Sequence, residues 1–488
     1  MRGMIIALLA LVLVSADAAH YVPQLLANAQ TSANPAPLLW EASQTGSKRA
    51  QQALVDYAET HHKPFWLEKL VGLKNPAAAW ALYQRMPLDN RQPALLSLAA
   101  NGNVPEAQLA LAMSTDTPEQ REKWLVKAAK QQYLPAQAAL ADWYLLNQAP
   151  AKARQWLVKT AEQYPQSAYQ LGRLLWDEGK FTKGKALLGQ AASQGHELAQ
   201  RLTQVLSVYK PVRPASVGAA NWPEQQQCRQ RIQMFATSLS SIERASQLYR
   251  QFAGDKRLAS LPLCIQPPVW LANNTLKCDS NLDNSGRLGC DLRPLAGAIE
   301  QRDATHIIVV ADLGKANVHN GAMYLDLSDS YSVMVHELAH FAGFIDEYPL
   351  PSPVAQQHCT QPDAPNLVIH GKLTYAPQST LERWQNVSGA LQIAPSKTCE
   401  AIGQPAYKPS QQITFLEHHD SGVIPGQYLQ LWQQQLARPD QQRPIYMNLF
   451  QRFHYAGNTP QAGKWLKKYN SFNSTDKPTS SSTKALEE

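Results

Sequence analysis

The chain has 488 residues and a formal net charge of +7, with 17% of its residues charged. A chain of this length is expected to hold two or three domains, each large enough to bury its own core. The Lys and Arg residues form no block and no nucleic-acid motif accompanies them, so nucleic-acid binding has no support. The charge permits at most a weak attraction to an anionic envelope surface.

The first residues are typical of an export signal. Arg2 provides a positive end, an apolar run covers residues 5–14, and Ala16-Asp17-Ala18 is a small-x-small cleavage pattern. The apolar run is too short to span a bilayer as a mature helix, and no later segment reaches the required length. We therefore expect a signal peptide at residues 1–18 and a soluble exported protein, periplasmic or secreted. An uncleaved N-terminal anchor is the alternative.

Residues 19–208 are expected to form helices, because related sequence blocks recur at about 29 to 32 residues between Trp66 and Arg201. The blocks are at residues 66–71, 95–100, 124–129, 156–161 and 187–192. Each precedes a short turn and an Ala-rich helix start, where small side chains let paired helices pack closely. The W-L-x-K-A-A and A-Q patterns resemble the Sel-like branch of the tetratricopeptide superfamily. That resemblance implies a solenoid with a concave face, acting as a binding module for a substrate or an envelope protein partner.

A Pro-rich, aperiodic stretch predicts a linker at residues 209–223. All six cysteines lie beyond it, and an even number in one part of an exported chain suggests three disulfides. We favour nearest-neighbour pairing, although the sequence alone allows other pairings. Zinc ligation by cysteine is the alternative, but the chain contains no C-x-x-C pair. The expected pairs are Cys228 with Cys264, Cys278 with Cys290, and Cys359 with Cys399.

Residues 224–435 are expected to form a domain of mixed helices and strands. The β-branched apolar run at residues 306–311 predicts a central strand. Asn320-Gly321 is a turn signal, and residues 322–327 predict a second strand just before a helix.

That helix carries the motif H-E-x-x-H at His336, Glu337 and His340. Positions four apart lie on one face of a helix, so the two imidazoles can bind one metal ion. Neutral imidazole is a common ligand of Zn²⁺. Glu337 lies one step round the helix, where its carboxylate can reach a metal-bound water and act as general base. A surface helix that carries these residues without a metal is the alternative.

Gly343 can end the helix with a left-handed turn, which would bring Asp346 back toward the metal as a third ligand. The resulting pattern H-E-x-x-H-x-x-G-x-x-D resembles the metzincin signature, with Asp in the place of the usual third His. The resemblance implies a zincin-like α+β domain that hydrolyses peptide bonds. It also implies an edge strand that pairs with an extended substrate, for which residues 321–327 are the best candidate.

A second, weaker similarity covers residues 305–428. Asp346-Glu347-Tyr348, Pro365-Asn366-Leu367, Trp384 and residues 407–410 are similar to bacterial metallopeptidases of the IgA-peptidase type. One feature departs from metzincins, which carry a Met-containing turn beneath the metal. The segment after Ser410 has no Met, so Phe415 or Leu416 would take that place.

Some assignments stay open. Glu347, or a His of the pair His418-His419, is an alternative third ligand, and Tyr348 or Tyr407 could assist the reaction. Residues 436–470 predict a C-terminal helix pair, and residues 471–488 predict a disordered tail.

The sequence therefore favours an exported zinc-dependent metalloendopeptidase with a helical-repeat module and no nucleic-acid partner. A non-catalytic envelope scaffold with a structural or degenerate metal site is the alternative, although a purely structural site would not need Glu337. An enzyme that cuts another bond, such as a cell-wall amide, is a further alternative.

Overall fold

The computed structural model describes residues 21–224, 227–282, 286–360, 364–369, 378–387 and 391–474. The expected signal peptide at residues 1–18 lies outside this range, as does most of the expected tail. Among the described residues, no helix is long and apolar enough to cross a membrane. The chain divides into two compact units, Met1–Gln200 and Arg201–Glu488.

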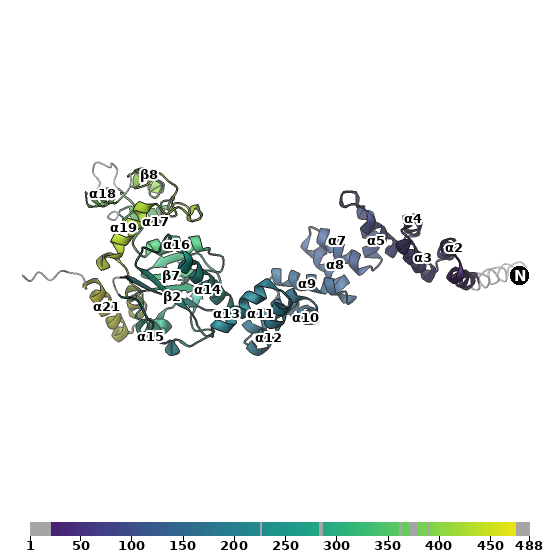
Figure 1. Ribbon diagram of the computed structural model, residues 1–488, viewed down its shortest axis with the longest axis horizontal. Helices are drawn as coiled ribbons and strands as arrows, with labels where there is room; N and C mark the ends of the chain where they lie inside the picture. Colours follow the sequence, from purple (N-terminus) through teal and green to yellow (C-terminus); the bar gives the residue numbers. More distant parts are fainter. Residues whose placement is uncertain are drawn as a thin grey trace, which may run out of the picture. The chain divides into compact units, whose positions relative to one another are not determined.

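The first unit is a helical-repeat solenoid, as the repeat predicts (Figure 1). The five sequence blocks fall on the first helix of successive pairs, and the Ala-rich starts fall on the second. Buried alanines such as Ala79, Ala107 and Ala136 allow close packing within the pairs. Residues 21–31 are helical. The helices after them are α2 (Ala36–Gln44), α3 (Lys48–Thr60), α4 (Pro64–Gly72), α5 (Pro76–Arg85), α6 (Pro93–Asn101), α7 (Pro105–Ser114), α8 (Pro118–Lys130), α9 (Leu134–Leu146), α10 (Pro150–Thr160), α11 (Pro165–Asp177), α12 (Phe181–Ser193) and α13 (Glu197–Val208).

The second unit contains a five-stranded sheet in the order β2-β1-β5-β7-β6. The first four strands run parallel, and β6 is antiparallel to β7. Residues 306–310 form a strand that is buried throughout, as its apolar run predicts. The strands are β1 (Gln230–Ala236), β2 (Leu263–Trp270), β5 (His306–Val310), β6 (Asn317–His319) and β7 (Ala322–Leu325), with small two-stranded sheets formed by β3 (Cys278–Asp279) with β4 (Gly289–Cys290), and β8 (Ala394–Ser396) with β9 (Ala406–Lys408).

The two edge strands of the main sheet are β2 and β6, so the expectation that residues 321–327 form an edge was wrong. Asn320 and Gly321 both adopt positive φ, of 43° and 79°, and connect β6 to β7 as a two-residue hairpin turn. The hairpin folds residues 317–319 onto the outside of the sheet, and β7 becomes an inner strand.

Among the described residues, eight further α-helices complete the second unit. Figure 1 shows α17, α18 and β8 on one side of α16, and the main sheet on the other. The helices are α14 (Leu239–Gly254), α15 (Ala296–Gln301), α16 (Tyr331–His340), α17 (Ser352–Cys359), α18 (Gln378–Gln385), α19 (Gly426–Leu436), and the C-terminal pair α20 (Ile445–Tyr455) and α21 (Thr459–Ser474).

Three expected boundaries need correction. The C-terminal pair does form, but it shares one hydrophobic core with the sheet through residues such as Leu449 and Trp465, so it is not a separate domain. The expected linker is attached to the sheet as well. Val212 N donates to Trp270 O at 2.8 Å, and Val217 is buried in the same core. Residues 471–474, expected in the tail, continue α21.

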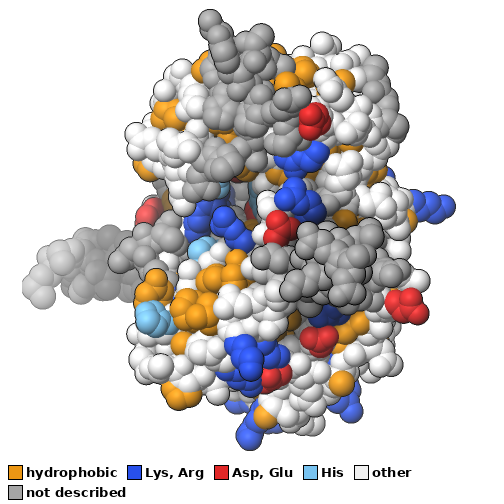
Figure 2. Space-filling model, turned by 90° about the vertical axis from the view of Figure 1, so that its left-hand side faces the viewer, with side chains coloured by type: hydrophobic (Ala, Val, Ile, Leu, Met, Phe, Trp, Pro, Cys, Tyr) orange, Lys and Arg blue, Asp and Glu red, His pale blue; other side chains and the backbone are white. Residues whose placement is uncertain are grey.

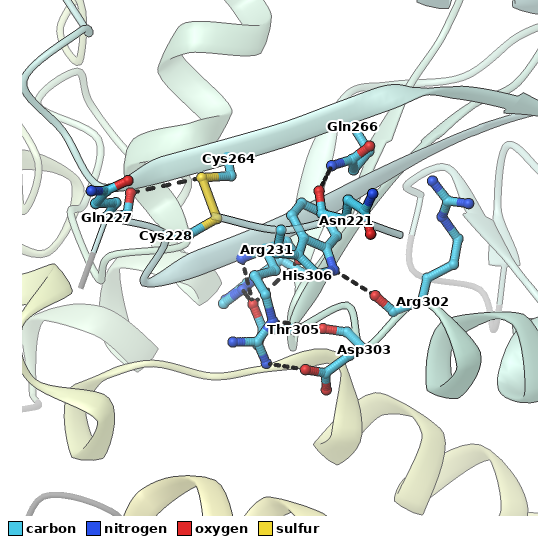
Figure 3. The surroundings of a disulfide bond; sticks show 11 residues. Asn221, Gln227, Cys228, Arg231, Cys264, Gln266, Arg302, Asp303, Thr305 and His306 are labelled. Atoms are coloured by element: carbon cyan, nitrogen blue, oxygen red, sulfur yellow. Dashed lines mark hydrogen bonds and ion pairs between the residues drawn. A yellow bond between two sulfur atoms is a disulfide. The ribbon is translucent and has the colours of Figure 1, made fainter. Parts of the chain in front are cut away.

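The three disulfides have the nearest-neighbour pairing, which confirms the interpretation of the cysteines. Cys228–Cys264 joins the start of β1 to β2 beside Arg231, Thr305 and His306 (Figure 3). Cys278–Cys290 joins β3 to β4, and Cys359–Cys399 joins the end of α17 to the segment after β8. No cysteine is left free to bind a metal ion.

Candidate metal centre

Helix α16 is capped at its start and is followed by the turn that Gly343 predicts. The Ser330 side chain caps it by accepting a hydrogen bond from Val333 N at 3.4 Å. At the other end Gly343 has φ +81°, and Phe344 N donates to Ala339 O at 3.3 Å, so the chain turns back at once. The next residues, Ile345 and Asp346, are thereby directed under the last turn of the helix.

The turn brings three ligand atoms together. His336 Nε2 and His340 Nε2 are 3.1 Å apart, as expected for positions four apart on a helix. Asp346 Oδ1 lies 2.9 Å from the first nitrogen and 3.2 Å from the second. Three residues predicted as ligands therefore meet at one point.

The backbone fixes which imidazole nitrogens carry hydrogen. His336 Nδ1 lies 2.9 Å from Phe415 O, and His340 Nδ1 lies 2.9 Å from Phe344 O. A carbonyl oxygen only accepts, so both Nδ1 atoms are the donors, and both Nε2 atoms of the neutral rings present lone pairs. Asp346 Oδ1, which is buried, then has no hydrogen-bond donor among the described residues. Three lone pairs that converge in this way can be satisfied by a cation or by a proton between them.

The pKa values of these groups show the same mutual attraction. Burial lowers the pKa of His340, but the neighbouring Asp346 carboxylate outweighs burial and raises it to about 9. Burial raises the pKa of Asp346, yet attraction to the two imidazoles holds it well below its usual range. Without a metal ion the site therefore retains a proton in the place of the cation.

The ligand set suits zinc. Zinc at about 2.0–2.1 Å from each donor in tetrahedral geometry places two ligands roughly 3.3 Å apart, close to the separations found here. Two nitrogens and one oxygen are donors that zinc accepts, and three protein ligands leave one position open. The carboxylate of Glu337 also faces this cluster, because ligand atoms of His336, Glu337 and His340 all lie within 4.8 Å of one another.

Glu347, the alternative third ligand, points away from the cluster into a buried polar network. Its side chain has no exposed surface. Its Oε1 accepts from Asn366 Nδ2 at 2.9 Å and from the Tyr428 hydroxyl at 2.7 Å, and its Oε2 accepts from the Thr414 hydroxyl at 2.5 Å. Lys408 Nζ lies 3.5 Å from the same Oε2. These contacts leave no oxygen of Glu347 for the metal ion.

The network holds two parts of the metal centre in place. Glu347 N donates to Leu416 O at 3.0 Å, which ties the segment after Asp346 to the segment containing Phe415. Asn366 also bonds the backbone of Ile345 on the other side of Asp346, through its Oδ1 at 3.0 Å and its Nδ2 at 2.8 Å. Phe415 and Leu416 thus lie next to the ligand cluster, because their carbonyl oxygens accept from His336 Nδ1 and from Glu347 N.

We expect Glu347→Gln to destabilise the second unit by roughly 2–4 kcal/mol, because an amide would present N–H groups to hydroxyl and ammonium donors in a buried site. The zinc affinity should fall as well, since Asp346 and Phe415 are held through this network. Denaturant unfolding and zinc titration measure the two effects. The exposed Glu400 on the same unit provides the control Glu400→Gln, which should change neither.

The remaining candidates lie around the site rather than in it. His418 and His419 line the adjoining cleft but do not join the ligand cluster, and His419 Nδ1 pairs with Asp420 at 3.0 Å. The Tyr348 ring stacks on that of His336 with centroids 6.3 Å apart, and its pKa is raised by burial and by Asp346. Tyr407 belongs to β9 and is not among the residues that line the cleft.

The metal centre opens into a cleft of about 1300 Å³. The edge strand β6 lines one side, and residues of α17 and of the segment around Arg383 and Gln435 line another. The sequence interpretation missed the basic residues of this cleft and the network around Glu347. Neither has a local signal, because both are assembled from residues far apart in the chain.

No protein-family model matches the chain, and no curated protein matches it. Solved structures match about a third of it. A protective antigen of uropathogenic Escherichia coli with an SLR fold is 19% identical over 35% of this chain, with a TM-score of 0.29, and the matched part spans 43% of the antigen. A Sel1 repeat protein from Oxalobacter formigenes is 22% identical over 35% of this chain and 69% of its own length (TM-score 0.24). An immunity protein from Pseudomonas aeruginosa is 20% identical over 36% of this chain and 82% of its own length (TM-score 0.24).

Proposed function

We propose that the second unit is a zinc-dependent peptidase of the zincin type, and that the helical repeats bind a substrate or a partner protein. The observation that carries the proposal is the convergence of His336 Nε2, His340 Nε2 and Asp346 Oδ1, with a buried carboxylate beside them. The three disulfides agree with export to an oxidising compartment.

His336, His340 and Asp346 would hold the zinc ion. A zinc ion bound there supplies a Lewis acid that polarises the carbonyl of the scissile bond and acidifies water. The hydrogen bonds from the two Nδ1 atoms to backbone carbonyls fix the orientation of both rings and strengthen them as donors.

Glu337 is suited to the role of general base. Burial raises the pKa of its carboxyl above the usual value, while the two nearby imidazoles oppose this rise. A base with a raised pKa holds a proton more firmly, so Glu337 can take one from the attacking water and then deliver it to the leaving amine. Tyr348 beside His336 can donate a hydrogen bond to the oxyanion that develops on the scissile carbonyl.

The edge strand supports a peptide as substrate. Residues 316–320 line the cleft along β6, and a strand at the edge of a sheet can pair with an extended peptide backbone. This mode of binding holds an unfolded segment without requiring a particular side chain at every position.

A direct test is cleavage profiling by mass spectrometry on an extract of envelope proteins. The purified protein should produce new peptide termini when it contains zinc, lose this activity after chelation, and regain it when zinc is restored. A protein that carries stoichiometric zinc and produces no new termini would contradict the proposal. That outcome would favour the scaffold, or an enzyme that cuts another bond.

A further inference from the structure

The cleft next to the metal centre is lined by more basic than acidic side chains. Figure 2 shows Lys and Arg side chains gathered along the hollow that crosses this face of the second unit. The basic residues lining the cleft are Arg287, Lys315, Arg383, Arg438, Arg443 and Arg452. The acidic residues lining it are Asp329, Glu337, Asp346 and Glu417.

The acidic side chains are already committed to other partners. Asp346 belongs to the metal centre, and Glu337 faces it. Glu417 is paired with Lys408. Asp329 Oδ2 accepts a hydrogen bond from Asp326 N at 2.7 Å, just before the start of α16. Arg438 is paired with Asp440 at 3.4 Å, whereas none of these four carboxylates is paired with Lys315 or Arg443 among the described residues.

Two of the basic residues lie at the ends of the edge hairpin. Lys315 lies two residues before the start of β6. Arg443 lies in the segment before α20 that packs on the hairpin turn, since a Cβ at Gly321 would be 2.2 Å from Ile445 N. Both side chains are exposed, and neither has an acidic partner among the described residues. A peptide bound along β6 would pass between them.

Arg287 lines the same cleft as Glu337, Tyr348 and His358. Basic side chains are therefore present both beside the edge strand and elsewhere in the cleft that contains the ligand cluster.

We propose that the cleft binds extended peptide segments rich in Asp and Glu, with Lys315 and Arg443 contacting carboxylates on either side of the bond to be cut. This inference rests on the proposed function, because it assigns a substrate class to the same site. The edge strand favours a peptide over other polyanions, since only a peptide backbone can pair with it along its length.

The test uses three fluorogenic peptides with one common central sequence and flanks of Asp and Glu, of Asn and Gln, or of Lys. The zinc-loaded full-length protein should cleave the acidic peptide with a kcat/KM at least about tenfold above that of the neutral one, and the basic peptide most slowly. Each of Lys315→Ala and Arg443→Ala should lower the acidic-to-neutral ratio roughly threefold, the size of effect that exposed charge pairs produce. Lys256→Ala, which removes an exposed charge outside the cleft, should leave the ratio unchanged.

Binding of the same peptides to Glu337→Gln, measured by fluorescence anisotropy, separates this inference from the proposed function. Equal cleavage of all three peptides would overturn the inference and keep the peptidase. Absence of cleavage together with preferential binding of the acidic peptide, weakened by Lys315→Ala or Arg443→Ala, would overturn the peptidase and support the acidic ligand. Competition by a polysaccharide of equal charge as strongly as by the acidic peptide would overturn the assignment to a peptide.

Discussion

Glu337→Gln should abolish peptide hydrolysis while zinc stays bound. Gln has nearly the same size and shape as Glu, so the helix and the three ligands should keep their places. It cannot accept a proton from water, and general-base catalysis contributes about 10²- to 10⁴-fold to a rate. We therefore expect kcat to fall by at least about 100-fold, with little change in KM for the peptide.

The measurement is steady-state cleavage of a peptide identified by profiling, with zinc content determined on the same samples. Glu382→Gln is the matched control, because Glu382 is an exposed glutamate of the same unit outside the cleft. Full activity in Glu337→Gln would show that another residue serves as the base. Loss of zinc in this variant would instead make Glu337 part of the metal site.

His340→Ala should remove most of the bound zinc. The substitution leaves His336 and Asp346 as the only two ligands, and it breaks the bond from His340 Nδ1 to Phe344 O that steadies the turn toward Asp346. Because loss of a partner outside the ligand set already weakens metal binding about 10- to 100-fold, loss of a ligand should cost more than about 100-fold.

Zinc content after dialysis against a weak chelator measures this effect. His418→Ala is the informative control, since His418 lines the same cleft and was an alternative ligand by sequence. We expect it to retain zinc at the wild-type level. If His418→Ala lost zinc and His340→Ala kept it, the ligand set of His336, His340 and Asp346 would be wrong.

The sequence by itself determined the features that depend on neighbouring residues. The helical repeat followed from blocks at a regular spacing, because each helix pair packs mainly against the next pair. The position of His336, Glu337 and His340 on one helix followed from helical periodicity. Gly343 predicted the turn that brings Asp346 back toward the two histidines. The nearest-neighbour disulfides also join segments that are close in sequence.

Only the tertiary structure decided which of the neighbours Asp346 and Glu347 faces the metal centre. Adjacent side chains in an extended segment point in opposite directions, and the direction here depends on partners that lie far away in sequence. Asn366, Thr414 and Tyr428 hold Glu347, while the carbonyl of Phe415, 79 residues from His336, orients the first imidazole.

The position of the edge strand in the sheet and the basic lining of the cleft also depend on the tertiary structure. A stretch of sequence that predicts a strand does not reveal the position of that strand in the sheet. The prediction placed residues 321–327 at the edge, whereas in the structure the three residues of β6 lie there. Lys315 and Arg443 are 128 positions apart by their residue numbers, and the packing of the segment before α20 on Gly321 brings them to one hairpin. Local patterns fixed the chemical groups of the site, whereas their orientation and surroundings required long-range contacts that no local pattern records.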